Sequence, residues 1–102
     1  MQARFRFVLA ILALGLSVHL TAQAQEGHEL YEQSCQACHA TGVAGAPEVG
    51  DSAEWAALEA KGMDELMQSA INGKGIMPPR GGSNADDDTI RAAIEYMLEE
   101  SS

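Results

Sequence analysis

Two cysteines and a histidine form the most reactive cluster in the sequence. They stand in the run Cys35-Gln36-Ala37-Cys38-His39, and the 102 residues contain no other cysteine. This C-x-x-C-H spacing is the pattern of covalent haem attachment. Two thiols separated by two residues can reach the two vinyl groups on one side of a porphyrin, and a histidine directly after the second thiol is delivered to the iron. The pattern therefore predicts thioether bonds from Cys35 and Cys38 and iron ligation by His39.

Three other kinds of site also use a C-x-x-C pair. A thioredoxin-like redox pair belongs near a βαβ pattern, and no stretch of this chain shows strand alternation. A structural zinc site takes four Cys or His ligands, and beyond the motif only the distant His28 is available. A structural disulfide would close a very short loop and would leave His39 unexplained. The five-residue motif by itself leaves these alternatives open.

Met77 is the candidate for a second iron ligand. A haem with six-coordinate iron needs a donor on each face, and Met or His is the usual choice. Met77 lies within residues 73–82, which hold four glycines and two prolines. Pro78 favours an extended backbone at Met77, and the glycines allow the backbone to approach a flat ring closely. His28 is the rival ligand and is expected at the surface, whereas the methionines on predicted helix faces are expected to fill the core: Met63, Met67 and Met97.

The N-terminal segment has the three parts of a secretory signal peptide. Arginines near the start supply positive charge, residues 7–18 form an almost unbroken apolar run, and residues 22–24 place alanines where a signal peptidase reads small residues. The run is shorter than the roughly 20 apolar residues that span a bilayer, so cleavage after Ala24 is expected instead of a permanent anchor. The prediction is a leader over residues 1–24 and a periplasmic domain over residues 25–102, without stable membrane insertion.

The predicted mature chain is short and strongly acidic. It holds four basic and fifteen acidic residues, a net charge of −11 with histidines neutral. Nucleic acid and anionic lipid are poor partners for such a surface, whereas a basic protein surface would be steered toward it. A domain of this size often needs a metal, a disulfide or another staple to complete its core.

The rest of the sequence predicts an all-α fold. Glycine and proline place loops at residues 41–50 and 73–82. Asp51, with Glu54 three residues later, has the spacing of a capping box, and Gly62 suits the end of the helix that follows. The predicted helices run over Glu26–Ser34, from Asp51 or Ser52 to Lys61, over Asp64–Asn72, and onward from a cap at Asp87 or Asp88.

With these motifs the chain resembles a class I cytochrome c and, within that class, the small bacterial cytochrome c5 group. The resemblance covers residues 25–100 and implies about four short helices wrapped around one covalently bound haem c. It rests on the haem-attachment motif and on the following residues and runs: Gly45-Ala46-Pro47, Gly50-Asp51, Trp55, Asn72-Gly73-Lys74-Gly75, Met77-Pro78-Pro79 and Glu95-Tyr96-Met97.

The resemblance implies roles for two residues beside the motif. The carbonyl of Pro47 should accept a hydrogen bond from the second ring nitrogen of His39, which would brace the ring. Trp55 should either lie against the haem and reach a propionate or simply be buried in the core.

The resemblance also implies one packing contact and shows one departure. Gly27 and Tyr31 match a Gly-x-x-x-aromatic pattern in which the glycine lets the last helix cross closely, with Ala93 and Tyr96 opposite. Relatives often carry a second cysteine pair where this chain has residues 83–86, Ser-Asn-Ala-Asp, so no additional disulfide is expected.

The function expected from these features is one-electron transfer between protein partners. No paired carboxylates, no nucleophile with a base and no phosphate loop point to an enzyme. Two alternatives stay open, namely a haem subunit of a periplasmic redox complex and a haem-based ligand sensor from whose iron Met77 dissociates. The run Asp86-Asp87-Asp88 fits either a docking patch or, more simply, a helix cap with solvated neighbours.

Overall fold

The computed structural model describes residues 21–102, which form a set of short helices. Residues 21–30 are helical and run directly into a π-helical turn, η1 (Tyr31–Cys35). The later elements are α2 (Gln36–His39), η2 (Val43–Gly45), α3 (Ser52–Ala60), α4 (Met63–Asn72), η3 (Pro79–Gly82) and α5 (Asp87–Glu100).

The predicted all-α fold is confirmed. Over residues 21–102 there is no strand, and the only β feature is an isolated bridge between Lys74 and Met77. None of the helices in this range is both long and apolar enough to cross a membrane. Most of the predicted leader, residues 1–20, lies outside the described residues.

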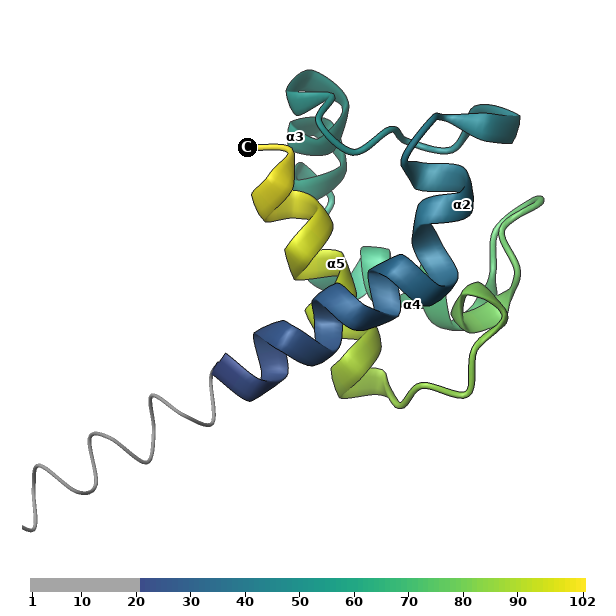
Figure 1. The fold of residues 1–102 in the computed structure, drawn as a ribbon. Helices are drawn as coiled ribbons and strands as arrows, with labels where there is room; N and C mark the ends of the chain where they lie inside the picture. Colours follow the sequence, from purple (N-terminus) through teal and green to yellow (C-terminus); the bar gives the residue numbers. More distant parts are fainter. Residues whose placement is uncertain (1–20) are drawn as a thin grey trace, which may run out of the picture.

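The first helical run is longer than predicted and contains a change of pitch. The prediction covered Glu26–Ser34, whereas helical backbone extends from residue 21 to His39 (Figure 1). At the change of pitch the Gln36 N–H donates to the carbonyl of Tyr31, five residues back, as in a π-helix. The haem-attachment motif therefore lies at the end of a continuous rod, which fixes the direction in which its side chains point.

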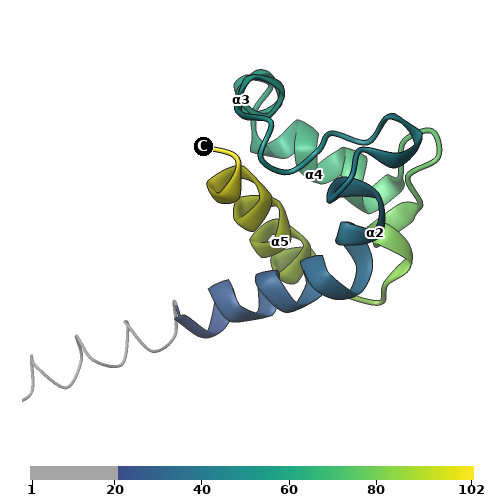
Figure 2. The ribbon, with the colours of Figure 1, turned by 45° about the horizontal axis from the view of Figure 1, so that its top comes forward.

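The start of this rod crosses α5 at very close range (Figures 1 and 2). A Cβ atom added to Gly27 would lie 2.5 Å from the carbonyl carbon and oxygen of Ala92. The predicted crossing is confirmed, although the residue nearest Gly27 is Ala92 and not Ala93. The rings of Tyr31 and Tyr96 meet one turn further along, with centroids 5.0 Å apart.

The crossing closes one side of the hydrophobic core. Met63 and Met67 pack against the core while partly buried, and Met97 lies inside it, so the predicted role of the three methionines is confirmed. The residues that form the buried core are Leu30, Tyr31, Trp55, Ala70, Ile90, Ala93, Ile94 and Met97.

The middle helices begin and end close to the predicted residues. Asp51 caps α3, because its Oδ1 accepts the N–H of Glu54 at 3.2 Å. Gly62, between α3 and α4, has a φ of +95°, and Gly73, after α4, has a φ of +83°. These conformations favour glycine, which explains why both helices stop where they do.

The predicted cap of the last helix is wrong by one residue. Asp86, and neither Asp87 nor Asp88, caps α5, and its Oδ1 accepts the N–H of Thr89 at 2.9 Å. This hydrogen bond lowers the pKa of the Asp86 carboxyl. Asp87 instead pairs with Arg80 at 2.8 Å. The N–H of Thr89 lies just before the first backbone bond of the helix, which runs from the Ile90 N–H to the Asp86 carbonyl, and the Asp86 carboxylate accepts it. In a run of three aspartates, only the geometry identifies which of them makes the cap.

Candidate cofactor site

A cavity of about 420 Å³ lies between the first helical run, α3, α4 and α5. Its walls come from segments far apart in the sequence, because the cysteine motif lies near the N-terminus and the methionine loop follows α4. All six residues predicted for the site line it: Cys35, Cys38, His39, Pro47, Trp55 and Met77.

The lining of the cavity is mostly apolar. No Asp or Glu side chain lines it, although the chain holds fifteen, and its charged residues are Lys74 and Arg80. Arg80 is already held by Asp87 and by the carbonyl of Ala85. Such a wall suits a flat apolar group that carries charge only at its edge. The residues present therefore fit the predicted haem.

His39 is held in one orientation by hydrogen bonds on both its ring and its backbone. It is 9% exposed, and its Nδ1 lies 2.8 Å from the carbonyl oxygen of Pro47. A carbonyl only accepts, so Nδ1 carries the proton and Nε2 keeps its lone pair for a metal. The backbone N–H of Val49 donates to the carbonyl of His39 at 2.7 Å. The Pro47 contact has the geometry expected of a brace for a metal-ligating ring.

Cys35 and Cys38 form no disulfide with each other. Burial raises the pKa of the Cys35 thiol to about 11. A thiol–disulfide exchange site needs a thiolate near neutral pH, so this environment is unlike that of a thioredoxin-type pair. Over residues 21–102, no group of three or more His, Cys, Asp or Glu side chains is arranged to hold a metal ion.

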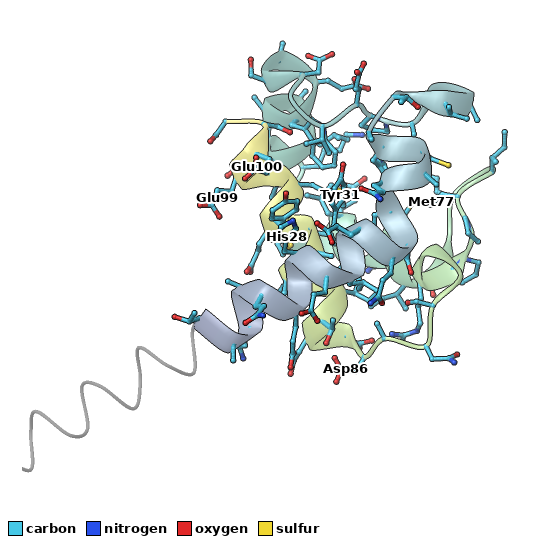
Figure 3. All side chains as sticks on the ribbon, in the orientation of Figure 1. His28, Tyr31, Met77, Asp86, Glu99 and Glu100 are labelled. Carbon is cyan, nitrogen blue, oxygen red and sulfur yellow. The ribbon has the colours of Figure 1, made fainter. Side chains whose placement is uncertain are left out.

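Met77 lies at the base of a tight turn that follows α4. Lys74 and Met77 exchange two backbone hydrogen bonds of 3.0 Å each, and Ile76 at the tip is 77% exposed. The Met77 side chain is half-buried and packs against the core (Figure 3). A Cβ atom at Gly73 would come within 2.8 Å of the Met77 carbonyl oxygen. Gly73 thus allows the turn to fold back under the methionine.

Trp55 forms part of the cavity wall beside His39. It is 4% exposed, and its ring centroid lies 5.9 Å from that of His39. Its indole N–H donates to the carbonyl of Glu48 at 2.9 Å, so this donor is already used within the protein. Direct contact between Trp55 and a bound haem stays a prediction.

His28 stands apart from the cavity. Its side chain is 49% exposed, pairs with Glu32 at 2.9 Å and stacks on Tyr96 with ring centroids 4.5 Å apart (Figure 3). The surface location predicted for it agrees with this arrangement.

Comparison with known proteins identifies the family. The sequence matches the family described as cytochrome C oxidase, cbb3-type, subunit III, over residues 22–97. It is 42% identical to cytochrome c-555 of Chlorobaculum tepidum, with 94% of this chain and 97% of that protein covered. The chain belongs to the class I c-type cytochromes.

Other relatives agree with this assignment. Cytochrome c5 of Azotobacter vinelandii is 42% identical, with 72% of this chain and 93% of that protein covered. Among solved structures, a chain from an electron transfer complex of nitrite reductase with cytochrome c is 48% identical, has a TM-score of 0.73, and is matched over 76% of this chain and 95% of its own length. Cytochrome c551 of Ectothiorhodospira halophila is 42% identical, with a TM-score of 0.60 and coverage of 72% and 96%. This cytochrome therefore carries a covalently bound c-type haem and serves electron transfer, not catalysis.

Sequence reasoning missed the hydrogen bonds that hold the loop behind His39. The carbonyl of Glu48, the N–H groups of Val49 and Gly50, and the side chain of Ser101 all take part. Three of these are backbone groups, which carry no residue-specific signal. Ser101 follows two exposed glutamates at the end of a helix, where a serine is unremarkable.

Proposed function

We propose that this cytochrome is a soluble, periplasmic carrier of single electrons, with its haem bonded to Cys35 and Cys38 and ligated by His39 and Met77. The observation that carries the proposal is that these four side chains line one cavity from two separate segments. A bound haem supplies one iron that alternates between the ferrous and ferric states. If His39 and Met77 both ligated that iron, no position would remain for oxygen or a substrate, as a pure electron carrier requires.

The residues around the cavity favour the reduced state. The thioether of Met77 stabilises ferrous iron and so raises the reduction potential. The apolar lining, which includes no carboxylate, disfavours the additional positive charge of ferric iron. The acidic surface acts in the opposite direction, but solvent and salt screen it.

The rim of the cavity supports contact with redox protein partners. Val43 and Ile76 line the cavity and are 53% and 77% exposed, and Lys74 lies beside them. A small apolar contact of this kind suits a short-lived encounter. The acidic residues lie away from the lining, so we infer that they steer partners with basic docking surfaces from a distance. The solved cytochrome c relative in complex with nitrite reductase supports a redox enzyme as one such partner.

Export is the second part of the proposal. The leader predicted over residues 1–24 directs the chain to the periplasm, where it is removed after Ala24. Mass spectrometry of protein made with its own leader tests both steps. A mass equal to residues 25–102 plus one haem, together with a c-type pyridine haemochrome spectrum, is expected. A mass equal to the bare polypeptide would overturn the haem assignment, and retention of residues 1–24 would overturn the cleavage.

Met77→Ala tests the second ligand, with Met67→Ala as its matched control. Met67 is a half-buried methionine of α4 that packs against the core without lining the cavity. The oxidised wild type and Met67→Ala should show the sulfur-to-iron charge-transfer band, and Met77→Ala should lack it. Persistence of the band in Met77→Ala would remove Met77 from the site. Rapid carbon monoxide binding to the reduced wild type would favour a ligand sensor over a carrier.

A second candidate function is a haem subunit of a larger redox complex. The match to the family described as subunit III of a cbb3-type cytochrome c oxidase favours it. Against it, a cytochrome c-555 of nearly the same length aligns over 97% of its own chain. Purification from the native source distinguishes the two, because a carrier should elute alone and a subunit should elute with a stable partner.

A further inference from the structure

Residues 47–50 form a short brace segment that is hydrogen-bonded at every residue. The Pro47 carbonyl lies 2.8 Å from His39 Nδ1, and the Glu48 carbonyl accepts the Trp55 indole N–H at 2.9 Å. The Val49 N–H donates to the His39 carbonyl at 2.7 Å. The fourth hydrogen bond joins the segment to a distant part of the chain, because the N–H of Gly50 donates to a residue near the C-terminus.

That residue is Ser101, whose Oγ accepts the Gly50 N–H at 3.0 Å. Ser101 ends α5 and is only 2% exposed. Over residues 21–102, the buried polar or charged residues are His39 and Ser101, and both are bonded to the brace segment. Buried Ser101 thus holds the brace segment, and the brace segment in turn holds buried His39.

We propose that Ser101 is a positioning residue that fixes the brace segment and thereby sets the strength of the hydrogen bond from His39 Nδ1 to the Pro47 carbonyl. Gly50 has a φ of +100°, and because glycine restricts φ and ψ little, the backbone of Gly50 does not by itself hold the segment in place. Without Ser101 Oγ, the Gly50 N–H loses its partner, and a methyl group in the same buried place cannot replace it. The Pro47 carbonyl, three residues away, then moves more freely against the imidazole.

The sign of the effect follows from the role of this hydrogen bond. Donation from Nδ1 to a carbonyl increases the negative character of the imidazole and makes Nε2 a stronger donor to a metal. A stronger donor stabilises ferric iron more than ferrous iron. Loosening the brace segment therefore raises the reduction potential. This inference rests on the proposed ligation by His39.

The test compares Ser101→Ala with Ser102→Ala in the holoprotein. Ser102 is the matched control, because it is exposed and its hydroxyl donates to the carbonyl of Glu99, in the last turn of α5. Two quantities are measured, namely the reduction potential and the solvent exchange rate of the His39 Nδ1 proton by NMR. Ser101→Ala should raise the potential above that of both other proteins and speed the exchange on the order of tenfold. Ser102→Ala should change neither.

The possible failures are distinguishable. If the wild-type His39 ring protons show no shift from the iron, ligation by His39 is wrong and the proposed function fails. If they are shifted and Ser101→Ala lowers the melting temperature without changing the potential or the ring exchange, Ser101 is only structural and this inference is wrong.

A second measurement covers the case in which Ser101→Ala does not fold. In the wild type, native-state hydrogen exchange should give the Gly50 amide and the His39 Nδ1 proton the same dependence on denaturant, because one opening exposes both. Opening of Gly50 at much lower denaturant, with the ring proton still protected, would overturn the inference.

Discussion

Replacing Gly73 by alanine should disrupt the turn that presents Met77, whereas the same change at Gly75 should be mild. Gly73 has φ +83° and ψ 160°, a region occupied essentially by glycine alone, and forcing alanine into it costs about 1–3 kcal/mol. Its Cβ would also lie 2.8 Å from the Met77 carbonyl oxygen and 3.0 Å from the Pro79 nitrogen. These neighbours are backbone atoms that cannot rotate away, so overpacking adds about 1–3 kcal/mol.

Gly75 provides the control because it lies in the same turn without the crowding. Its φ is +60°, and nothing lies within 4 Å of an added Cβ. Alanine there carries only the left-handed cost of roughly 1–2 kcal/mol, part of which the reduced freedom of the unfolded chain offsets. We therefore expect a loss of stability of about 3 kcal/mol for Gly73→Ala and about 1 kcal/mol for Gly75→Ala.

Two assays read this difference. The melting temperature should fall by about 15 °C for Gly73→Ala and by about 5 °C for Gly75→Ala, from the relation between free energy and melting temperature for a domain of this size. Added imidazole, which competes for the position proposed for Met77, should bind the ferric Gly73→Ala protein roughly 30-fold more tightly than the Gly75→Ala protein, since 1.4 kcal/mol corresponds to tenfold. Equal effects of the two substitutions on both measurements would refute the reasoning from crowding.

Two further substitutions test how α5 is held. Gly27→Ala should lower the free energy of unfolding by about 2 kcal/mol, because overpacking against the Ala92 backbone costs about 3 kcal/mol and the gain in helix propensity is only roughly 1 kcal/mol. Denaturant unfolding measures this change, with Glu26→Ala as the exposed control on the same helix. A stabilised Gly27→Ala protein would show that the helices do not cross this closely. Asp86→Ala should lower the melting temperature at neutral pH, because the wild-type carboxylate caps α5. The pKa of Asp86 is lowered in the folded state, so its contribution is present above the ordinary carboxyl pKa and disappears as the pH falls through the lowered value. The melting curves of the two proteins should therefore converge in acid, and a constant gap at all pH values would contradict the assignment of the cap.

The sequence was sufficient where structure is decided by near neighbours. The capping pair Asp51 and Glu54 and the stop at Gly73 act within one turn of helix, so they placed α3 and α4 correctly. The cysteine motif and the Met77 loop carry their chemistry in residue type and spacing, and they do line one cavity.

The features that were missed depend on contacts between distant parts of the chain. Asp86 caps α5, whereas its neighbour Asp87 forms an ion pair with Arg80. The crossing at Gly27 was predicted, but its neighbour there is Ala92 and not Ala93, because the exact angle between the two helices decides which residue lies nearest and no local pattern encodes that angle. Ser101 and Gly50 are 51 positions apart, and their bond joins a hydroxyl to a backbone amide, so neither residue type reveals it.

The π-helical turn at Tyr31–Cys35 has a consequence for how this protein tolerates insertions and deletions. The helix before the turn is fitted to α5 through Gly27 and Leu30, whereas the motif after it faces the cavity. A π turn is closed by a hydrogen bond to the fifth residue back, where an α turn uses the fourth, so it holds one residue more for about the same rotation around the axis. Losing one residue from this turn should therefore leave an ordinary α-helical turn, with the thiols and the imidazole still facing the cavity. Losing one residue from the α-helical part before it, with the π turn kept, would instead rotate the motif by about 100° relative to α5. The turn is thus the one place in this helical run where the chain can be a residue shorter without turning the haem-attachment motif away from its cavity.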